Sequence, residues 1–252
     1  MQKFWTWLSR YASPPVFYRT AGLWRPWMGL ATLLFGVPAL VYGLFFAPPD
    51  YLQGESYRII YLHVPAAWVS MFAYVAMAAA GAAALIWHTK LSEIAVTCIA
   101  PLGAGFTALT LLTGMLWGRP TWGAYWVWDA RLTSELVLLF LYLGVIGLAS
   151  AYGDARRGAR AAALLSLVGL INLPIIHYSV RWWNTLHQGS TVRMFGESSI
   201  DGSMLWALLA SAMAAKFYFV WSLLGRLRLQ LLAAESEKAW VAKELNLEQA
   251  ND

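Results

Sequence analysis

Six long apolar runs constrain this chain more than any other feature of its sequence. They cover residues 27–47, 61–87, 94–116, 132–152, 161–180 and 204–224. Each is close to the length of about 20 residues that a helix needs to cross a bilayer. Uninterrupted runs predict helices, because a membrane barrel would alternate polar and apolar residues. The composition agrees, with 12% charged residues against about 25% in soluble proteins. We therefore predict an all-α polytopic membrane protein with six transmembrane helices.

The distribution of Lys and Arg predicts the orientation of these helices. One side of the predicted membrane carries twelve basic residues and the other carries five. The twelve are Lys3, Arg10, Arg19, Arg25, Lys90, Arg156, Arg157, Arg160, Arg226, Arg228, Lys238 and Lys243, and the five are Arg58, Arg119, Arg131, Arg181 and Arg193. Because cytoplasmic connections are enriched in basic residues, both termini are predicted to be cytoplasmic.

This topology predicts three parts of the chain. Residues 1–26 form a cytoplasmic, partly interfacial segment, and residues 27–224 form the membrane domain with an external connection at 117–131. Residues 225–252 form a cytoplasmic tail. The basic residues lie beside membrane ends, which argues against nucleic acid as a partner. Cys98 is the only cysteine, lies within an apolar run and is expected to serve packing.

The external connection holds an unusual cluster of tryptophans. Residues 117–129 read WGRPTWGAYWVWD. Gly118, Pro120 and Gly123 are expected to break any long helix. A short helix from Trp122 onward would place Trp122, Tyr125, Trp126 and Asp129 on one face. This arrangement favours a platform for a large planar ligand over a simple membrane-interface belt. Trp117 alone is interpreted as a belt residue.

Two histidines are predicted on the same external side. His63 lies near the start of the second run, where Pro65 suits a first helical turn, and His187 lies in the third external connection. His88 is expected to be a loop residue and His177 a structural one. Haem fits the two external histidines, because it is planar and its iron accepts two axial imidazoles. Arg119, Arg131 or Arg193 are candidates to pair with its propionates. The residues alone support an external planar or metal-bearing ligand.

Two other functions remain open from the residues alone. One is a membrane oxidoreductase that uses bound haem for electron transfer. The other is a secondary transporter, which predicts a polar site at the membrane midplane with broken helices. Only Asn172 with Pro174, and Lys216, hint at such a site. The chain shows no nucleotide-binding motif, so no means of ATP hydrolysis is visible in it.

The tryptophan stretch also resembles a known signature. WGRPTWGAYWVWDARLTSEL resembles the WGxxWxWD signature of the haem-handling membrane proteins of cytochrome c biogenesis, with matches at Trp122, Gly123, Trp126, Trp128 and Asp129. YRIIYLHVPAAW and NLPIIHYSVRWWNTLHQGST extend the resemblance. Six spans and about 250 residues are similar to the haem exporter protein C group of the cytochrome c maturation system.

This resemblance implies a function and a set of partners. His63 and His187 would be the axial ligands of the iron of haem b. The cofactor-binding residues would be Trp122, Gly123, Tyr125, Trp126, Trp128, Asp129 and Arg131. The chain would not be an enzyme. It would lie in the bacterial inner membrane and deliver haem from its periplasmic face to a periplasmic haem chaperone. Its other partners would be the ATPase and membrane subunits of an ABC transporter and a small single-span subunit.

Overall fold

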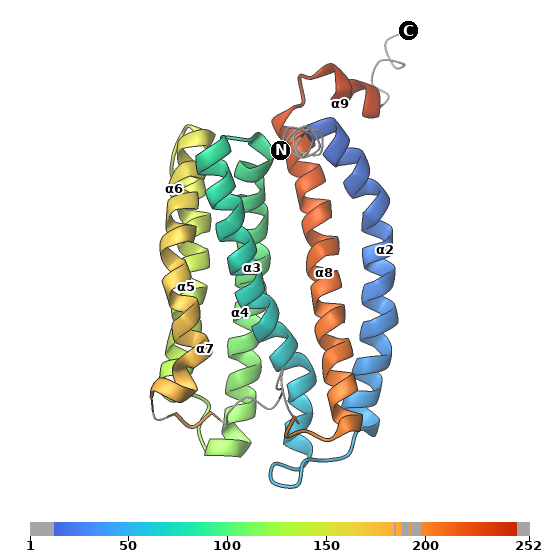
Figure 1. Cartoon of the computed structure of the whole chain (residues 1–252), viewed down its shortest axis with the longest axis vertical. Helices are drawn as coiled ribbons and strands as arrows, with labels where there is room; N and C mark the ends of the chain where they lie inside the picture. The colour runs from blue at the N-terminus through green and yellow to red at the C-terminus, as the bar shows by residue number, and fades with distance from the viewer. Residues whose placement is uncertain (1–12, 184, 188–191, 193–197, 246–252) are drawn as a thin grey trace, which may run out of the picture.

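The computed structural model is a bundle of long helices (Figure 1) and describes residues 13–183, 185–187, 192 and 198–245. Six helical segments are long and apolar enough to cross a membrane. They are α2 (Pro14–Val41) with a π-helical turn (Tyr42–Phe46), α3 (Ile60–Trp87) after a 3₁₀ turn (Glu55–Ile59), α4 (Lys90–Trp122), α5 (Ala130–Ser150), α6 (Ala155–Val168) joined by a 3₁₀ turn (Gly169–Ile171) to α7 (Asn172–Trp182), and α8 (Gly202–Ala234). A short helix, α9 (Ala239–Glu244), follows. The prediction of a six-span all-α membrane protein is confirmed.

The helices extend beyond the apolar runs, and α4 corrects one prediction. It continues through Gly118 and Pro120 and ends at Trp122. Pro120 has no N–H to donate to the backbone oxygen of Leu116, but it lies in the last turn, so a kink there displaces only the end of the helix. Gly123 then ends the helix in the left-handed region, with φ of 79°. Pro65 also falls inside α3 rather than in its first turn, because α3 already begins at Ile60.

Helices α2 and α8 pack closely side by side and run in opposite directions (Figure 1). Their contact follows a seam of glycines on α2, Gly22, Gly29 and Gly36, spaced seven residues apart. A Cβ at Gly29 would lie 3.0 Å from the Trp221 ring, and one at Gly36 would lie 3.2 Å from Ala214. A seven-residue spacing keeps small residues on one face of a helix, and glycines there let two backbones approach.

The other helices form a core with internal polar links. Tyr74, Met77, Leu138 and Tyr142 are buried where α3, α4, α5 and α6 meet. The Tyr142 hydroxyl donates to the backbone oxygen of Ser70 at 2.7 Å. These contacts hold α3 and α5 at a fixed spacing.

The break in the fifth span is also stabilised by a hydrogen bond. Asn172, at the start of α7, donates its amide to the backbone oxygen of Ser134 on α5 at 2.9 Å. This buried bond satisfies a carbonyl in the bundle. Asn172 therefore has a structural partner at the point where α6 gives way to α7.

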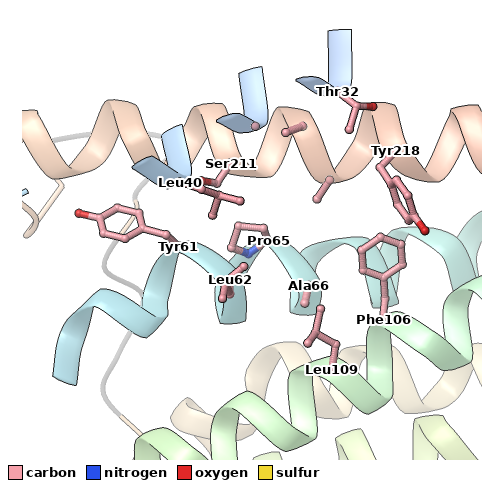
Figure 2. Close-up of a pocket in the computed structure, with 13 residues that line it drawn as sticks. Thr32, Leu40, Tyr61, Leu62, Pro65, Ala66, Phe106, Leu109, Ser211 and Tyr218 are labelled. Atoms are coloured by element: carbon pink, nitrogen blue, oxygen red, sulfur yellow. The ribbon is translucent and has the colours of Figure 1, made fainter. Parts of the chain in front are cut away.

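The two ends of the bundle differ. Helix α2 begins and α8 ends at one end, beside α9 (Figure 1). The opposite end carries the α4–α5 connection and the end of α7. Between α2, α3, α4 and α8 lies an apolar pocket of about 190 Å³, along which Tyr61, Pro65 and Phe106 are placed (Figure 2). No charged side chain lines this pocket. It therefore lacks the residues expected of the functional site.

Candidate haem site

A larger cavity of about 810 Å³ lies among α3, α4, α5 and α7, at the end opposite the start of α2. Cavities that hold small molecules and cofactors span about 300–1,000 Å³. Its charged and aromatic lining residues are His63, Trp68, Trp117, Trp122, Arg131, Glu135, His177, Arg181 and His187. The two histidines predicted as iron ligands therefore line the same cavity, although more than a hundred residues separate them in the chain. They are close enough to interact electrostatically.

His63 is held on the first turn of α3 by a contact with α4. Its Nδ1 lies 3.0 Å from the hydroxyl oxygen of Thr113. That hydroxyl already donates its proton to the backbone oxygen of Leu109 at 2.7 Å. Thr113 must therefore accept from Nδ1–H, which leaves the lone pair on Nε2. Gly114 leaves room for the ring, since a Cβ there would lie 3.1 Å from His63 Cε1.

His187 is held from a connection rather than from a helix. Its Nδ1 lies 2.8 Å from Oδ2 of Asp129. The Thr185 hydroxyl donates to the same carboxylate oxygen and accepts from the backbone N–H of His187. A carboxylate on Nδ1–H fixes the tautomer and orientation of an imidazole and leaves Nε2 free to bind a metal.

Asp129 also organises the start of α5. Its Oδ1 accepts from the backbone N–H of Leu132 at 2.8 Å and so caps the helix. Burial alone would raise the pKa of Asp129, but hydrogen bonds from His187, Thr185 and Leu132 outweigh it and lower the pKa to about 2. Asp129 is therefore ionised at neutral pH and is a permanent acceptor for His187.

Two tryptophans lie against the two histidines. The Trp117 ring meets His63 edge to face, with centroids 5.5 Å apart, and its Nε1 donates to the Gln53 side chain at 2.7 Å. The Trp122 ring meets His187 with centroids 4.7 Å apart. The interpretation of Trp117 as a belt residue was wrong, because this side chain is half-buried, hydrogen-bonded and part of the cavity wall.

Residues 123–129 of the tryptophan stretch lie outside the cavity wall. The predicted short helix from Trp122 onward is absent, because residues 123–129 are not helical. Gly123 ends α4 and Asp129 starts α5, so too few residues remain between them for a helix. Trp126 and Trp128 pack edge to face at 5.2 Å. Tyr125 is 54% exposed and Trp128 is 75% exposed, and the stretch forms a surface instead of the predicted shelf.

Charged groups line one wall of the cavity. Arg131 and Glu135 lie one turn apart on α5, and Arg181 lies at the end of α7. Arg131 donates from Nε to the Ser179 hydroxyl at 3.3 Å. Glu135 is buried and contacts the Ser70 hydroxyl at 2.9 Å. The wall therefore offers two guanidinium groups that suit carboxylates of a ligand.

The other arginines and histidines considered from the sequence lie in different parts of the molecule. Arg119 lies over the Tyr125 ring at 5.7 Å and is not part of the cavity wall. Arg193 lies outside the described residues. His177, expected to be structural, lines the cavity and packs against Tyr178 at 4.7 Å. His88 ends α3 in a left-handed conformation, with φ of 53°, as a loop residue.

These residues fit haem as a ligand. A planar macrocycle supplies four equatorial nitrogens to its iron, so the protein need contribute only two axial groups. Hydrogen bonds engage Nδ1 of both His63 and His187, which favours Nε2 as the nitrogen that binds the metal. Aromatic rings flank each imidazole, and the arginines suit propionates.

Several residues of this site were not predicted from the sequence. Thr113 and Gly114 orient and accommodate His63, Thr185 supports His187, and Glu135 is an ionisable group in an apolar run. Only Glu135 carried a clear signal, because an acidic residue within a membrane span is costly and usually functional.

Comparison with known proteins identifies the family. Residues 7–242 match the family model described as heme exporter protein C. The heme exporter protein C of Escherichia coli (strain K12) is 50% identical over 239 residues, which cover 95% of this chain and 96% of that protein. That of Haemophilus influenzae is 46% identical over 237 residues, covering 94% and 96%. A putative cytochrome c biosynthesis ccmC-like mitochondrial protein of Marchantia polymorpha is 46% identical over 182 residues, covering 72% and 76%. This multi-pass membrane protein belongs to the heme exporter protein C family.

Proposed function

We propose that this chain binds haem b in the cavity between α3, α4, α5 and α7, with His63 and His187 as the axial ligands of the iron. Membership of the heme exporter protein C family assigns the chain to haem handling in cytochrome c biogenesis, as a transport component and not an enzyme. One observation carries the proposal. Two imidazoles line one cavity, and each has its Nδ1 occupied by a hydrogen-bond partner, which leaves Nε2 for a metal.

The tryptophan stretch divides into two roles in this proposal. Trp117 and Trp122 fix the imidazoles from within the cavity wall. Tyr125 and Trp128 are exposed beside that wall. Exposed aromatic side chains are common at protein interfaces. We infer that Trp126, Trp128 and Tyr125, supported by Gly123, form the surface that presents haem to a periplasmic haem chaperone.

Location and partners complete the proposal. The cavity is lined from the start of α3 and the ends of α4 and α7, which lie opposite the start of α2 (Figure 1). The excess of basic residues at the other end favours a cytoplasmic position for that end. The cavity would then face the periplasm from the bacterial inner membrane. ATP hydrolysis would belong to the ATPase subunit of an associated ABC transporter. That transporter's membrane subunit and a small single-span subunit would be the other partners.

Absorption spectroscopy of the purified full chain tests the ligand assignment. The wild-type protein should show the spectrum of low-spin haem with two nitrogen ligands. His63→Ala and His187→Ala should each lose most of the bound haem or shift it to a five-coordinate spectrum. His88→Ala is a matched control, because His88 lies in the connection at the other end of α3. Wild-type spectra and full haem content in both ligand variants would overturn the proposal.

The same variants separate this function from electron transfer. A haem-delivery protein should pass haem to the chaperone in a reaction that depends on both histidines. An oxidoreductase would instead keep its haem and turn over with a quinol. Sustained quinol oxidation without haem transfer would favour the second function.

A further inference from the structure

A second cluster of charge lies at the opposite end of the bundle from the haem cavity. Here α2 and α8 each contain the pattern Gly-x-x-Arg, at Gly22–Arg25 and at Gly225–Arg228. Because the helices are antiparallel, each arginine lies over the glycine of the other helix. We call these four residues the arginine clasp.

The geometry of the clasp is reciprocal. A Cβ at Gly22 would lie 3.2 Å from Cζ of Arg228, and one at Gly225 would lie 2.9 Å from Nε of Arg25. Each guanidinium also lies over an aromatic ring of the opposite helix. Arg25 lies 5.0 Å from the Trp221 ring and Arg228 lies 4.3 Å from the Tyr18 ring.

The clasp has no acidic partner among the described residues. Glu244 pairs with Arg19, and Glu235 pairs with Lys90. No ion pair joins Arg25 or Arg228 to any carboxylate of residues 13–183 and 198–245, and their Nε atoms are buried without an acceptor there. A buried guanidinium nitrogen without an acceptor carries an uncompensated desolvation cost, and an anion bound at the clasp would offset it.

The surroundings of the clasp indicate which anion fits. Both arginines lie just outside the apolar runs at 27–47 and 204–224, at the level expected for lipid headgroups. Leu23, Trp24 and Trp27 of α2 are 72%, 57% and 62% exposed. Exposed tryptophans and leucine beside an arginine suit the boundary between headgroups and acyl chains. Guanidinium groups bind phosphate through two parallel hydrogen bonds.

We propose that the arginine clasp binds the phosphate of an anionic phospholipid in the membrane leaflet at this end of the bundle. Basic pockets between transmembrane helices bind acidic lipid headgroups in this way. The bound lipid would tie α2 to α8 at the end where their glycine seam begins. This binding is independent of the haem cavity at the other end.

Native mass spectrometry of the full chain with phosphatidylglycerol tests the proposal. The clasp variant Arg25→Gln/Arg228→Gln should retain at least about tenfold less of this lipid, from about 1.5 kcal/mol for the loss of one charge-assisted hydrogen bond. The matched control is Arg156→Gln/Arg157→Gln, which removes the same charge from exposed arginines at the same end. It should change retention by less than about twofold. Phosphatidylethanolamine, which carries no net charge, should bind weakly to all three proteins.

Several outcomes would overturn the proposal. Equal losses in the clasp and control variants would show a general attraction between charges. Displacement of phosphatidylglycerol by an equal concentration of inorganic phosphate would assign the clasp to a free anion. Haem binding and circular dichroism report folding. If the glutamine variant does not fold, lipid retention is measured on Arg25→Lys/Arg228→Lys instead. Lysine keeps the charge but cannot form the two parallel hydrogen bonds to phosphate. Wild-type lipid retention in that variant would contradict the proposal.

Discussion

Replacing Asp129 by Asn tests whether this carboxylate orients His187 for iron binding. Asn retains Oδ1, which can accept from the Leu132 N–H and preserve the cap of α5, since Asn and Asp cap helices about equally well. The substitution changes the second oxygen of the side chain, Oδ2. In the wild type Oδ2 accepts from His187 Nδ1, whereas the amide NH₂ of Asn at this position would donate. His187 would then carry its proton on Nε2, where a metal must bind.

The expected loss of haem affinity can be estimated from other metal sites in which a hydrogen-bond partner orients a ligating histidine. Loss of a hydrogen-bond partner behind a ligating histidine weakens metal binding by about 10- to 100-fold. This corresponds to about 1.4–2.7 kcal/mol. We expect the Asp129→Asn protein to bind haem more weakly by that factor while it keeps the cap of α5. Asp129→Ala should lose haem to the same extent and should also lose about 1 kcal/mol of stability with the cap.

Haem titration of the purified protein, followed at the Soret band, measures this change. Asp201→Asn is the control, because Asp201 caps α8 through the Ser203 N–H and no contact joins it to His187 among the described residues. It should bind haem as the wild type does. If Asp129→Asn also binds haem with wild-type affinity while His187→Ala does not, then Asp129 does not set the tautomer of His187.

Three further predictions follow from the same contacts. The lowered pKa of Asp129, about 2 against an ordinary 3.8, means that its ionised form stabilises the fold above pH of about 4. The difference in melting temperature between wild type and Asp129→Asn should be constant from pH 8 to 5 and shrink between pH 4 and 2, and a constant difference throughout would contradict it. Gly114→Ala places a Cβ 3.1 Å from His63 Cε1 and should shift the axial-ligand signals in electron paramagnetic resonance, whereas Gly105→Ala, with open space around it, should not. Trp128→Ala removes a side chain that is 75% exposed, so haem affinity should stay within about twofold while transfer to the chaperone slows, and normal transfer would place the docking surface elsewhere.

The architecture of the bundle could be predicted from the sequence because it depends on composition. Six apolar runs specify six helices, since lipid offers no hydrogen bonds to any other backbone conformation. The helix ends were harder, because α4 continues through Pro120 and stops at Gly123. A proline signal is local, but its cost depends on how much of the helix follows it and would be displaced by a kink. The seven-residue spacing of Gly22, Gly29 and Gly36 was visible in the sequence and indicates a close helix contact along one face of α2, but not that α8 makes it.

The candidate site was only partly predictable, for a physical reason. Residue types and topology placed His63 and His187 on one side of the membrane, but only tertiary packing brings them to one cavity. A helical spacing of Trp122, Tyr125, Trp126 and Asp129 suggested a shared face. The caps at Gly123 and Asp129 instead leave that segment extended. Side-chain partners such as Thr113 have no sequence signature, because their role depends on the neighbouring helix.

The two proposed ligands differ in how firmly the protein holds them, and this difference suits a protein that must release its haem. His63 is on a helix, between the Thr113 hydroxyl and the Trp117 ring, at a place where Gly114 fits the imidazole closely. His187 follows the end of α7 by five residues and is fixed through the side chains of Asp129 and Thr185. Moving His63 would disturb the packing of α3 on α4, whereas moving His187 would break its contacts with Asp129 and Trp122 without displacing a helix. Release of haem should therefore begin at His187, on the side where Trp122 joins the cavity to the exposed tryptophan surface.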